Sequence, residues 1–184
     1  MKATEVKPGM AIRQDGKLYV ITKVEHRTPG NLRAFHQIKM REIEKGGYIE
    51  RRYSSSDELD VTTLDRRPME YLYSEPGGHV FMDNEDYEQI TLSEDMIGDD
   101  KVFLTANLPV VIHLHETNPV MIDLPSSIEV EVTDTPPGIK GATATNQLKE
   151  ATRETGLKTK VPPFISIGDK IRVSTADGSY QSRA

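Results

Sequence analysis

The sequence predicts an all-β protein of three small domains, and three observations support this fold class. Apolar residues recur mostly at every second position, as in residues 128–132 (IEVEV), which is typical of strands with one buried face. Glycine, proline and Asp-Gly turn signals interrupt these runs at short intervals, which favours consecutive hairpins. The hydrophobic share of the 184 residues, 36%, is low for one deep core and adequate for several small cores.

Residues 1–65 form the first predicted domain, a strongly bent β-barrel made of consecutive hairpins. Asp15-Gly16 is a two-residue hairpin turn signal, and Lys45-Gly46-Gly47 turns the chain a second time. Between these turns, Pro29-Gly30 marks a loop over residues 27–33. The predicted strands are residues 11–12, 18–26, 34–43 and 48–53.

Residues 66–128 form the second predicted domain. Pro76-Gly77-Gly78 separates two strands, and Asp83-Asn84 interrupts the second of them. Ser93 is the expected N-cap of a short helical turn, because its hydroxyl can accept from free backbone N–H groups and acidic residues follow it. The predicted strands are residues 69–74, 79–82, 87–92, 108–115 and 120–124.

Residues 129–184 form the third predicted domain. Asp177-Gly178 turns a final hairpin of residues 170–174 with 179–183. Residues 138–160 are polar and rich in threonine, so they predict a long loop, which in a compact domain is usually functional or disordered. Domains of about 60 residues bury barely enough surface to be stable alone, so we expect the three to support one another by packing.

Charge is distributed unevenly along the chain. The whole sequence has 23 basic and 29 acidic residues, a net charge of −6, which argues against a nucleic-acid partner. Residues 1–65, however, hold 12 basic and 10 acidic side chains, whereas residues 66–128 hold 3 and 12. Because the local field decides where a polyanion docks, the basic stretch 27–52 predicts either a solvated pair of strands or a hairpin that meets phosphate.

Motifs for catalysis are scarce in this sequence. It has no cysteine, which excludes disulfides, thiolate nucleophiles and cysteine-bound zinc, and it lacks the G-x-S-x-G, phosphate-loop and H-E-x-x-H patterns. His113 and His115 share one face of a predicted strand near Glu116, either as half-exposed strand residues or as a metal pair of an enzyme. We expect a binding protein without catalytic residues, cofactor or metal.

Membrane insertion and export are not expected. No apolar run is long enough to span a bilayer, and residues 1–5 lack the apolar stretch of a signal peptide. A cytoplasmic protein fits the sequence best.

The loop at residues 28–33 is the best functional candidate on physical grounds. Pro29 stiffens it, Gly30 permits a sharp tip, and Asn31 tolerates a left-handed backbone while offering a donor and an acceptor. Arg33 carries a permanent planar charge that suits phosphate or base stacking. Such a hairpin tip can reach into a narrow cleft; an ordinary loop with a solvated arginine is the alternative.

Several stretches of the sequence follow one another in a characteristic order. They are residues 6–10 (VKPGM), 81–90 (FMDNEDYEQI), 136–141 (PPGIKG), 143–145 (TAT), 154–157 (ETGL), 161–162 (VP), 164–165 (FI), Gly168, 177–180 (DGSY) and 182–184 (SRA). Together these stretches resemble the bacterial elongation factor P family over essentially the whole chain.

The resemblance implies an SH3-like barrel of the KOW type followed by two OB-fold barrels, in an L-shaped arrangement with the outline of a tRNA. It implies a monomeric translation elongation factor that binds the 70S ribosome between the P and E sites, beside the peptidyl-tRNA. The tip loop, consisting of Pro29, Gly30, Asn31, Leu32 and Arg33, would steady the CCA end near the peptidyl-transferase centre. Stalled consecutive prolines could then react, since positioning alone lowers a barrier.

One departure of the tip loop from the family pattern matters. The family tip reads P-G-K-G-x-A-F, and its lysine is often extended by an enzyme, whereas Asn31 occupies the aligned position here. Other members carry a sugar-modified tip arginine, but Arg33 lies two places beyond that position. We therefore expect an unmodified loop, with Asn31 at the tip and Arg33 supporting the tRNA backbone.

The resemblance implies contacts in the third domain as well. Gly141, Thr143, Ala144 and Thr145 would lie near the E-site codon of the small subunit. Tyr180 and Arg183 would lie against tRNA or rRNA, which suits a ring that stacks and a guanidinium that pairs with phosphate. The acidic second domain would face basic ribosomal proteins.

Two other functions remain open from the sequence. One is an elongation factor P-like paralogue with a different ribosomal role, which the altered tip favours. The other is a generic OB-fold nucleic-acid-binding module, which would need exposed aromatic platforms on a basic groove.

Overall fold

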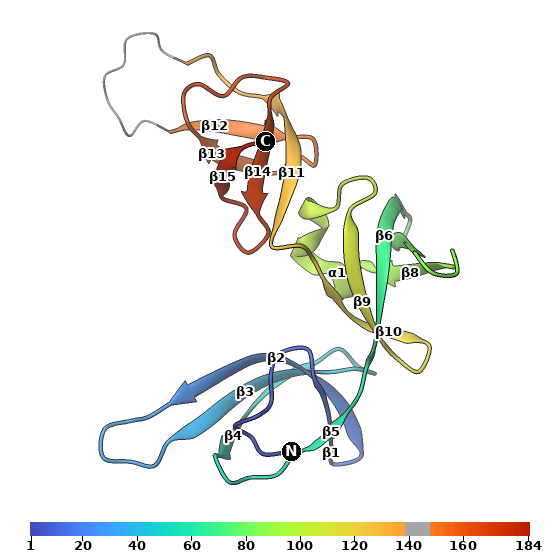
Figure 1. Cartoon of the computed structure of the whole chain (residues 1–184), viewed down its shortest axis with the longest axis vertical. Coiled ribbons are helices and arrows are strands. Elements are labelled where there is room, and N and C mark those ends of the chain that lie inside the picture. The colour runs from blue at the N-terminus through green and yellow to red at the C-terminus, as the bar shows by residue number, and fades with distance from the viewer. Residues whose placement is uncertain (139–147) are drawn as a thin grey trace. The chain divides into compact units, whose positions relative to one another are not determined.

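A computed structural model describes residues 1–138 and 148–184 and contains three curled five-stranded sheets (Figure 1), which confirms the predicted all-β fold class. The first sheet has the order β4-β3-β2-β1-β5. Its strands are β1 (Ala11–Gln14), β2 (Lys17–Arg27), β3 (Phe35–Glu42), β4 (Tyr48–Ser54) and β5 (Asp60–Thr62).

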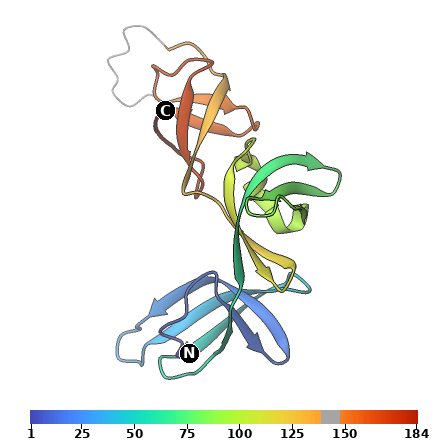
Figure 2. The same cartoon turned by 45° about the vertical axis from the view of Figure 1, so that its right-hand side comes forward.

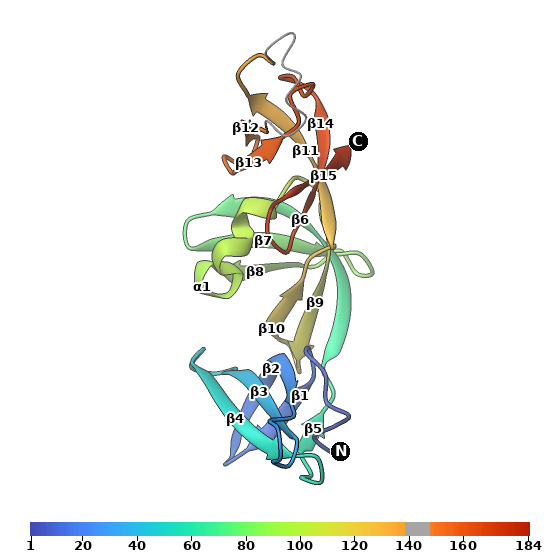
Figure 3. The same cartoon turned by 90° about the vertical axis from the view of Figure 1, so that its left-hand side faces the viewer.

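The second sheet has the order β10-β9-β6-β7-β8, and a short helical segment follows β8 (Figure 3). Ser93 caps this segment, since its hydroxyl accepts from the backbone N–H of Met96 at 3.3 Å, as the sequence predicts. The elements are β6 (Asp65–Glu75), β7 (Gly78–Asp83), β8 (Gln89–Ser93), α1 (Glu94–Ile97), the 3-10 helix η1 (Gly98–Phe103), β9 (Pro109–His115) and β10 (Asn118–Asp123).

The third sheet has the order β13-β12-β11-β14-β15. Its strands are β11 (Ser127–Asp134), β12 (Lys149–Arg153), β13 (Lys158–Val161), β14 (Lys170–Ser174) and β15 (Tyr180–Arg183).

The prediction of one long loop over residues 138–160 is wrong, because β12 and most of β13 lie within it. The inward-facing residues of these strands are Ala151, Arg153, Thr159 and Val161, all buried. An alanine, an arginine and a threonine do not produce the apolar alternation by which a strand is recognised. The burial alternates with a period of two, but the hydropathy does not.

Internal contacts divide the chain into two compact units. One comprises residues 1–67 and 111–122, and the other comprises residues 68–110 and 123–184. The predicted division into domains 1–65, 66–128 and 129–184 stays a prediction.

The core of the first unit forms inside the first sheet. Along β3 every second side chain is buried, so Ile38 and Met40 pack with Ile12 and Ile21, all fully buried. A second apolar cluster joins Ala11 and Val20 to residues outside the sheet, including Val120. These two clusters fix β2 and β3 at their inner ends, whereas their outer ends continue as a long hairpin (Figure 2).

The second unit has separate apolar centres in its two sheets. Phe81 on β7 and Leu92 on β8 are fully buried, and Val132, Ile165 and Ile171 are fully buried in the third domain.

The helices of the described residues are too short or too polar to span a bilayer.

Gly78 offers a test of how tightly β7 packs on β8. A Cβ atom at Gly78 would lie 2.6 Å from the carbonyl oxygen of Leu92 and 2.6 Å from the side chain of Thr91. We expect Gly78→Ala to lower the free energy of unfolding by about 1–3 kcal/mol through overpacking, measured by denaturant titration. Gly47→Ala is the control, since its Cβ would meet nothing within 4 Å, and an equal loss in both variants would contradict this packing.

Arg153 is a large buried cation with few partners. Only 1% of it is exposed, its Nε donates to the carbonyl of Leu157 at 3.3 Å, and its guanidinium lies 5.9 Å from the ring centre of Phe103. Within residues 1–138 and 148–184, Nη1 and Nη2 have no hydrogen-bond partner, and burial lowers the pKa of the group.

We expect Arg153→Met to raise the free energy of unfolding by about 1–4 kcal/mol, because it keeps the packing and removes the buried charge. Arg153→Ala should lower the same quantity by about 2–4 kcal/mol, because it leaves a cavity. Denaturant titration of both variants distinguishes charge from volume. A methionine variant less stable than the wild type would show that Phe103 and Leu157 compensate the charge.

Candidate nucleic-acid interface

The predicted tip loop connects β2 to β3 at the free end of the long hairpin (Figure 1). The backbone N–H of Leu32 donates to the carbonyl of Pro29 at 2.8 Å, which closes a four-residue turn with Gly30 and Asn31 at its centre. Leu32 is 72% exposed, and Asn31 and Arg33 are also exposed. The loop therefore presents its polar and apolar side chains to the surroundings.

The left-handed residue of this turn is Gly30, with a φ of 33°, whereas Asn31 has a negative φ. A Cβ atom at Gly30 would meet nothing within 4 Å, so the glycine is required by its backbone conformation and not by crowding. The tolerance of asparagine for a left-handed backbone is therefore not used here. The feature of Asn31 that remains for binding a partner is its side-chain amide.

Arg33 differs from the other arginine near the loop. The guanidinium of Arg27 donates to the carboxylate of Glu25 at 2.7 Å, and Lys23 forms an ion pair with the same carboxylate. These two cations lower the pKa of Glu25 to about 2. In the part of the chain that the structure describes, Arg33 has no carboxylate within ion-pair distance and remains available to an external anion.

The hairpin that carries the loop is paired on both sides of a register shift, which lies between Ile21 and Lys23 of β2. The β2–β3 register runs from Tyr19 opposite Glu42 to Arg27 opposite Phe35, directly at the loop. The rings of His26 and His36 lie 4.7 Å apart across the two strands near this end. The outer part of the hairpin, from Lys23 to the loop, is paired without a break and holds the tip at a defined distance from the core.

Phe35 and Tyr48 belong to a face that the sequence patterns did not reveal. Arg52 lies 4.8 Å from the ring centre of Phe35, and Lys39 lies 5.1 Å from the ring centre of Tyr48. Cations over aromatic rings on a basic strand surface are suited to phosphates and bases. The predicted strands 34–43 and 48–53 are joined by the turn at residues 45–47. Aligning them as a hairpin could have identified these two cation–ring contacts from the sequence.

Tyr180 and Arg183 lie on β15, which contains a bulge. Tyr180 is opposite Val173 and Arg183 is opposite Ile171, and the register shifts between these pairs. Val173 and Ile171 are both fully buried and share one face of β14. The bulge therefore brings Tyr180 and Arg183 to the same face of β15, although residues three apart point to opposite faces of a regular strand.

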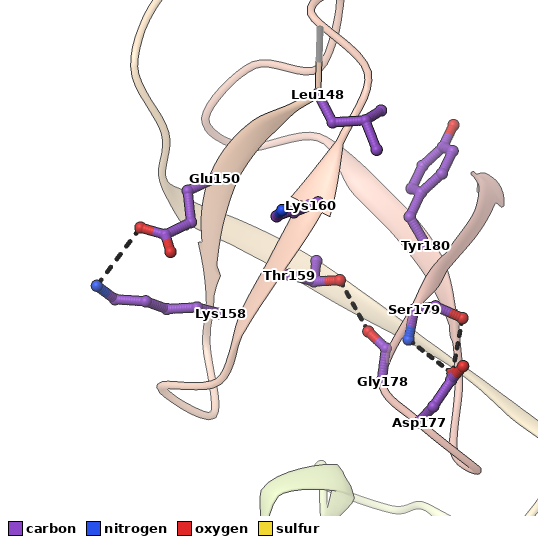
Figure 4. Close-up of a pocket in the computed structure, with 9 residues that line it drawn as sticks. All are labelled: Leu148, Glu150, Lys158, Thr159, Lys160, Asp177, Gly178, Ser179 and Tyr180. Atoms are coloured by element: carbon purple, nitrogen blue, oxygen red, sulfur yellow. Dashed lines mark hydrogen bonds and ion pairs between the residues drawn. The ribbon is translucent and has the colours of Figure 1, made fainter. Parts of the chain in front are cut away.

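The two side chains differ in their surroundings. Arg183 is exposed and donates to the carboxylate of Asp169 at 3.0 Å. Tyr180 is half-buried and borders an open groove of about 480 Å³ (Figure 4). The residues that line this groove are Leu148, Glu150, Lys158, Thr159, Lys160, Asp177, Gly178, Ser179 and Tyr180. Apart from Tyr180, the sequence analysis did not identify any of them as functional.

The other predicted site residues lie either outside the described residues or on β9. Gly141, Thr143, Ala144 and Thr145 lie outside the described residues. His113 is buried and His115 is half-buried on β9. Within the described ranges, 1–138 and 148–184, no three side chains of the metal-binding types come together.

Family models of elongation factor P match three consecutive parts of the chain. The KOW-like domain matches residues 2–59, the OB domain matches residues 64–122, and the C-terminal domain matches residues 128–183. These matches confirm the predicted order of a KOW-type barrel followed by OB-type barrels.

Curated relatives match the chain over nearly its full length. Elongation factor P of Acidobacterium capsulatum is 47% identical over 182 residues, which cover 99% of this chain and 98% of the relative. Elongation factor P of a Bradyrhizobium species is 40% identical and covers 99% of this chain and 97% of its own length. The protein from Mycobacterium avium is also 40% identical, over 97% of this chain and 96% of its own. The chain therefore belongs to the elongation factor P family of translation factors.

Proposed function

We propose that this translation factor binds the 70S ribosome between the P and E sites and holds the CCA end of the peptidyl-tRNA in a reactive position. The observation that carries this proposal is the tip loop. It places Asn31, and an arginine that has no carboxylate partner among the described residues, at the end of a hairpin that is paired from Lys23 to the loop.

Positioning is sufficient to explain an effect on consecutive prolines. The ring of proline restricts the approach of its nitrogen, so the productive geometry is rarely sampled when both reacting residues are constrained. Holding one reactant in place lowers the entropic part of the barrier and requires no covalent step by the factor. The factor acts in the cytoplasm, where translation takes place, and as a monomer.

The tip loop supplies two kinds of contact for this task. The guanidinium of Arg33 can donate two parallel hydrogen bonds to a phosphate of the tRNA backbone. The amide of Asn31 can both donate and accept, which suits a base edge or a ribose hydroxyl. The face of β3 and β4 with the Phe35–Arg52 and Lys39–Tyr48 pairs supports an RNA partner for the same sheet.

The third domain would add contacts at a distance from the tip. Tyr180 and Arg183 share a face of β15, which supports a role for both against tRNA or rRNA. A contact of Gly141, Thr143, Ala144 and Thr145 with the E-site codon stays a prediction.

A paralogous role on the ribosome is the second candidate function, and Asn31 favours it. An amide cannot be extended in the way that the amine of a lysine can. A factor with a shorter, unmodified tip could act on a different stalled state. A message without consecutive prolines that nevertheless requires the factor would distinguish this role from the first.

Reconstituted translation of a message with consecutive prolines tests the tip loop. We expect Arg33→Ala to slow proline–proline bond formation by about tenfold or more, because a hydrogen bond to a charged group contributes about 1.5–3 kcal/mol. Asn31→Ala should slow it less. Arg27→Ala is the matched control, since Glu25 already pairs with Arg27, and it should change the rate by no more than about twofold. Full activity of both loop variants would contradict the assignment of the loop.

The chemical state of the tip can be checked in protein isolated from its native host. We expect the peptide covering residues 29–35 to have the mass of the unmodified sequence, because Asn31 offers no amine for extension. Peptide mass spectrometry measures this directly, and the same protein produced in a heterologous host is the control. Added mass in the native peptide would show that the tip is modified.

A further inference from the structure

The groove beside Tyr180 lies between β13 and β15, which are not paired with each other in the described part of the chain. β13 and β15 are the two ends of the strand order. A side-chain hydrogen bond from the hydroxyl of Thr159 to the carbonyl of Gly178, at 2.8 Å, connects β13 to the β14–β15 turn. The opening of about 480 Å³ lies along this seam (Figure 4), and its size is typical of a small-ligand site.

One cation in the groove is available for a ligand. Lys158 pairs with the carboxylate of Glu150 at 3.6 Å, and both side chains are exposed. Lys160 is the next outward residue of β13, and no carboxylate of the described residues lies within ion-pair distance of its amine. An anion entering the groove would therefore meet Lys160 without displacing an existing partner.

The opposite wall carries a fixed carboxylate. Asp177 accepts from the hydroxyl of Ser179 at 2.7 Å and from its backbone N–H at 3.0 Å, and these bonds lower the pKa of Asp177. The ionised group repels phosphate and accepts hydrogen bonds from amino or imino groups. A ligand must therefore turn its anionic end toward Lys160 and its donor groups toward Asp177.

The mouth of the groove is apolar and partly aromatic. Leu148 is 57% exposed, and Figure 4 shows it at the same end of the groove as the ring of Tyr180. A flat, weakly polar group placed there would cover both side chains. Nucleobases stack on tyrosine in this way in single-stranded RNA recognition.

From these features we propose that the groove binds one unstacked nucleotide of an RNA strand, with its base on Tyr180 and Leu148 and its phosphate at Lys160. The proposal rests on the proposed function, which brings the chain to RNA. A peptide would cover the apolar mouth but leave Lys160 without a partner. Arg183, which the bulge places on the same face as Tyr180, lies farther along β15 where the strand leaves the groove.

The test is an NMR titration of the isotope-labelled full chain with a single-stranded uridine trinucleotide. Residue-resolved signals separate the groove from the basic face of the first sheet. We expect saturable shifts at Tyr180 and Lys160, and an affinity about 5- to 100-fold weaker in Tyr180→Leu. Tyr180→Phe should bind like the wild type, because the ring and not the hydroxyl provides the stacking surface.

Lys160→Gln should weaken binding and reduce the dependence of affinity on salt by about one counterion. Lys158→Gln is the matched control and should change neither quantity, since Glu150 already pairs with that lysine. If Tyr180→Leu and Lys160→Gln bind the trinucleotide as tightly as the wild type, the groove proposal is wrong. The proposed function would survive that result, because it is tested separately through the tip loop.

A photocrosslinker at position 148 identifies the source of the nucleotide on ribosomes with an occupied P site. A crosslink to tRNA, mRNA or rRNA supports the proposal and names the strand. Labelling confined to ribosomal protein, or no labelling of RNA by a factor that sediments with the ribosome, overturns it.

Discussion

The strict alternation of side chains along β3 is the constraint on which the first unit depends. His36, Ile38, Met40 and Glu42 face inward and are buried, whereas the residues between them face outward. A slip of one residue would bury Lys39 and Arg41 and expose the core, so the core fixes the register. That register also places Arg52 over Phe35, and beyond the shift between Ile21 and Lys23 the pairing of β2 with β3 continues to the tip loop.

The third sheet differs from the first in that it leaves an opening between its two end strands, β13 and β15. Among the described residues β13 and β15 are not paired with each other, and a hydrogen bond from the hydroxyl of Thr159 to the carbonyl of Gly178 spans the seam, so the barrel keeps an opening that a fully paired barrel would lack. The bulge in β15 then turns Arg183 to the side of Tyr180. The bulge in β15 and the opening beside it thus create a candidate binding surface, although β15 has only four residues.

Strands with apolar alternation and clear turn signals could be predicted from the sequence, as could the N-cap Ser93. β12 and β13 could not, because their buried positions hold Arg153 and Thr159, whose inward direction depends on tertiary packing. The tip loop could be identified from Pro29-Gly30 and Arg33. Its backbone could not, since hydrogen bonding of the turn decides that Gly30 and not Asn31 has the positive φ. The groove was missed for the same reason as the strands that form it.

The carboxylate of Glu25 has a consequence for how tightly the hairpin end can hold a polyanion. It pairs with both Lys23 and Arg27, so its single negative charge offsets half of their joint charge, and with a pKa of about 2 it stays ionised throughout the physiological range. A nucleic acid that touches the loop would then release fewer condensed counterions than an equal number of unpaired cations would release, so the entropic gain that dominates most such associations is reduced. Contact at this end would therefore depend more on geometry and would be more quickly reversible.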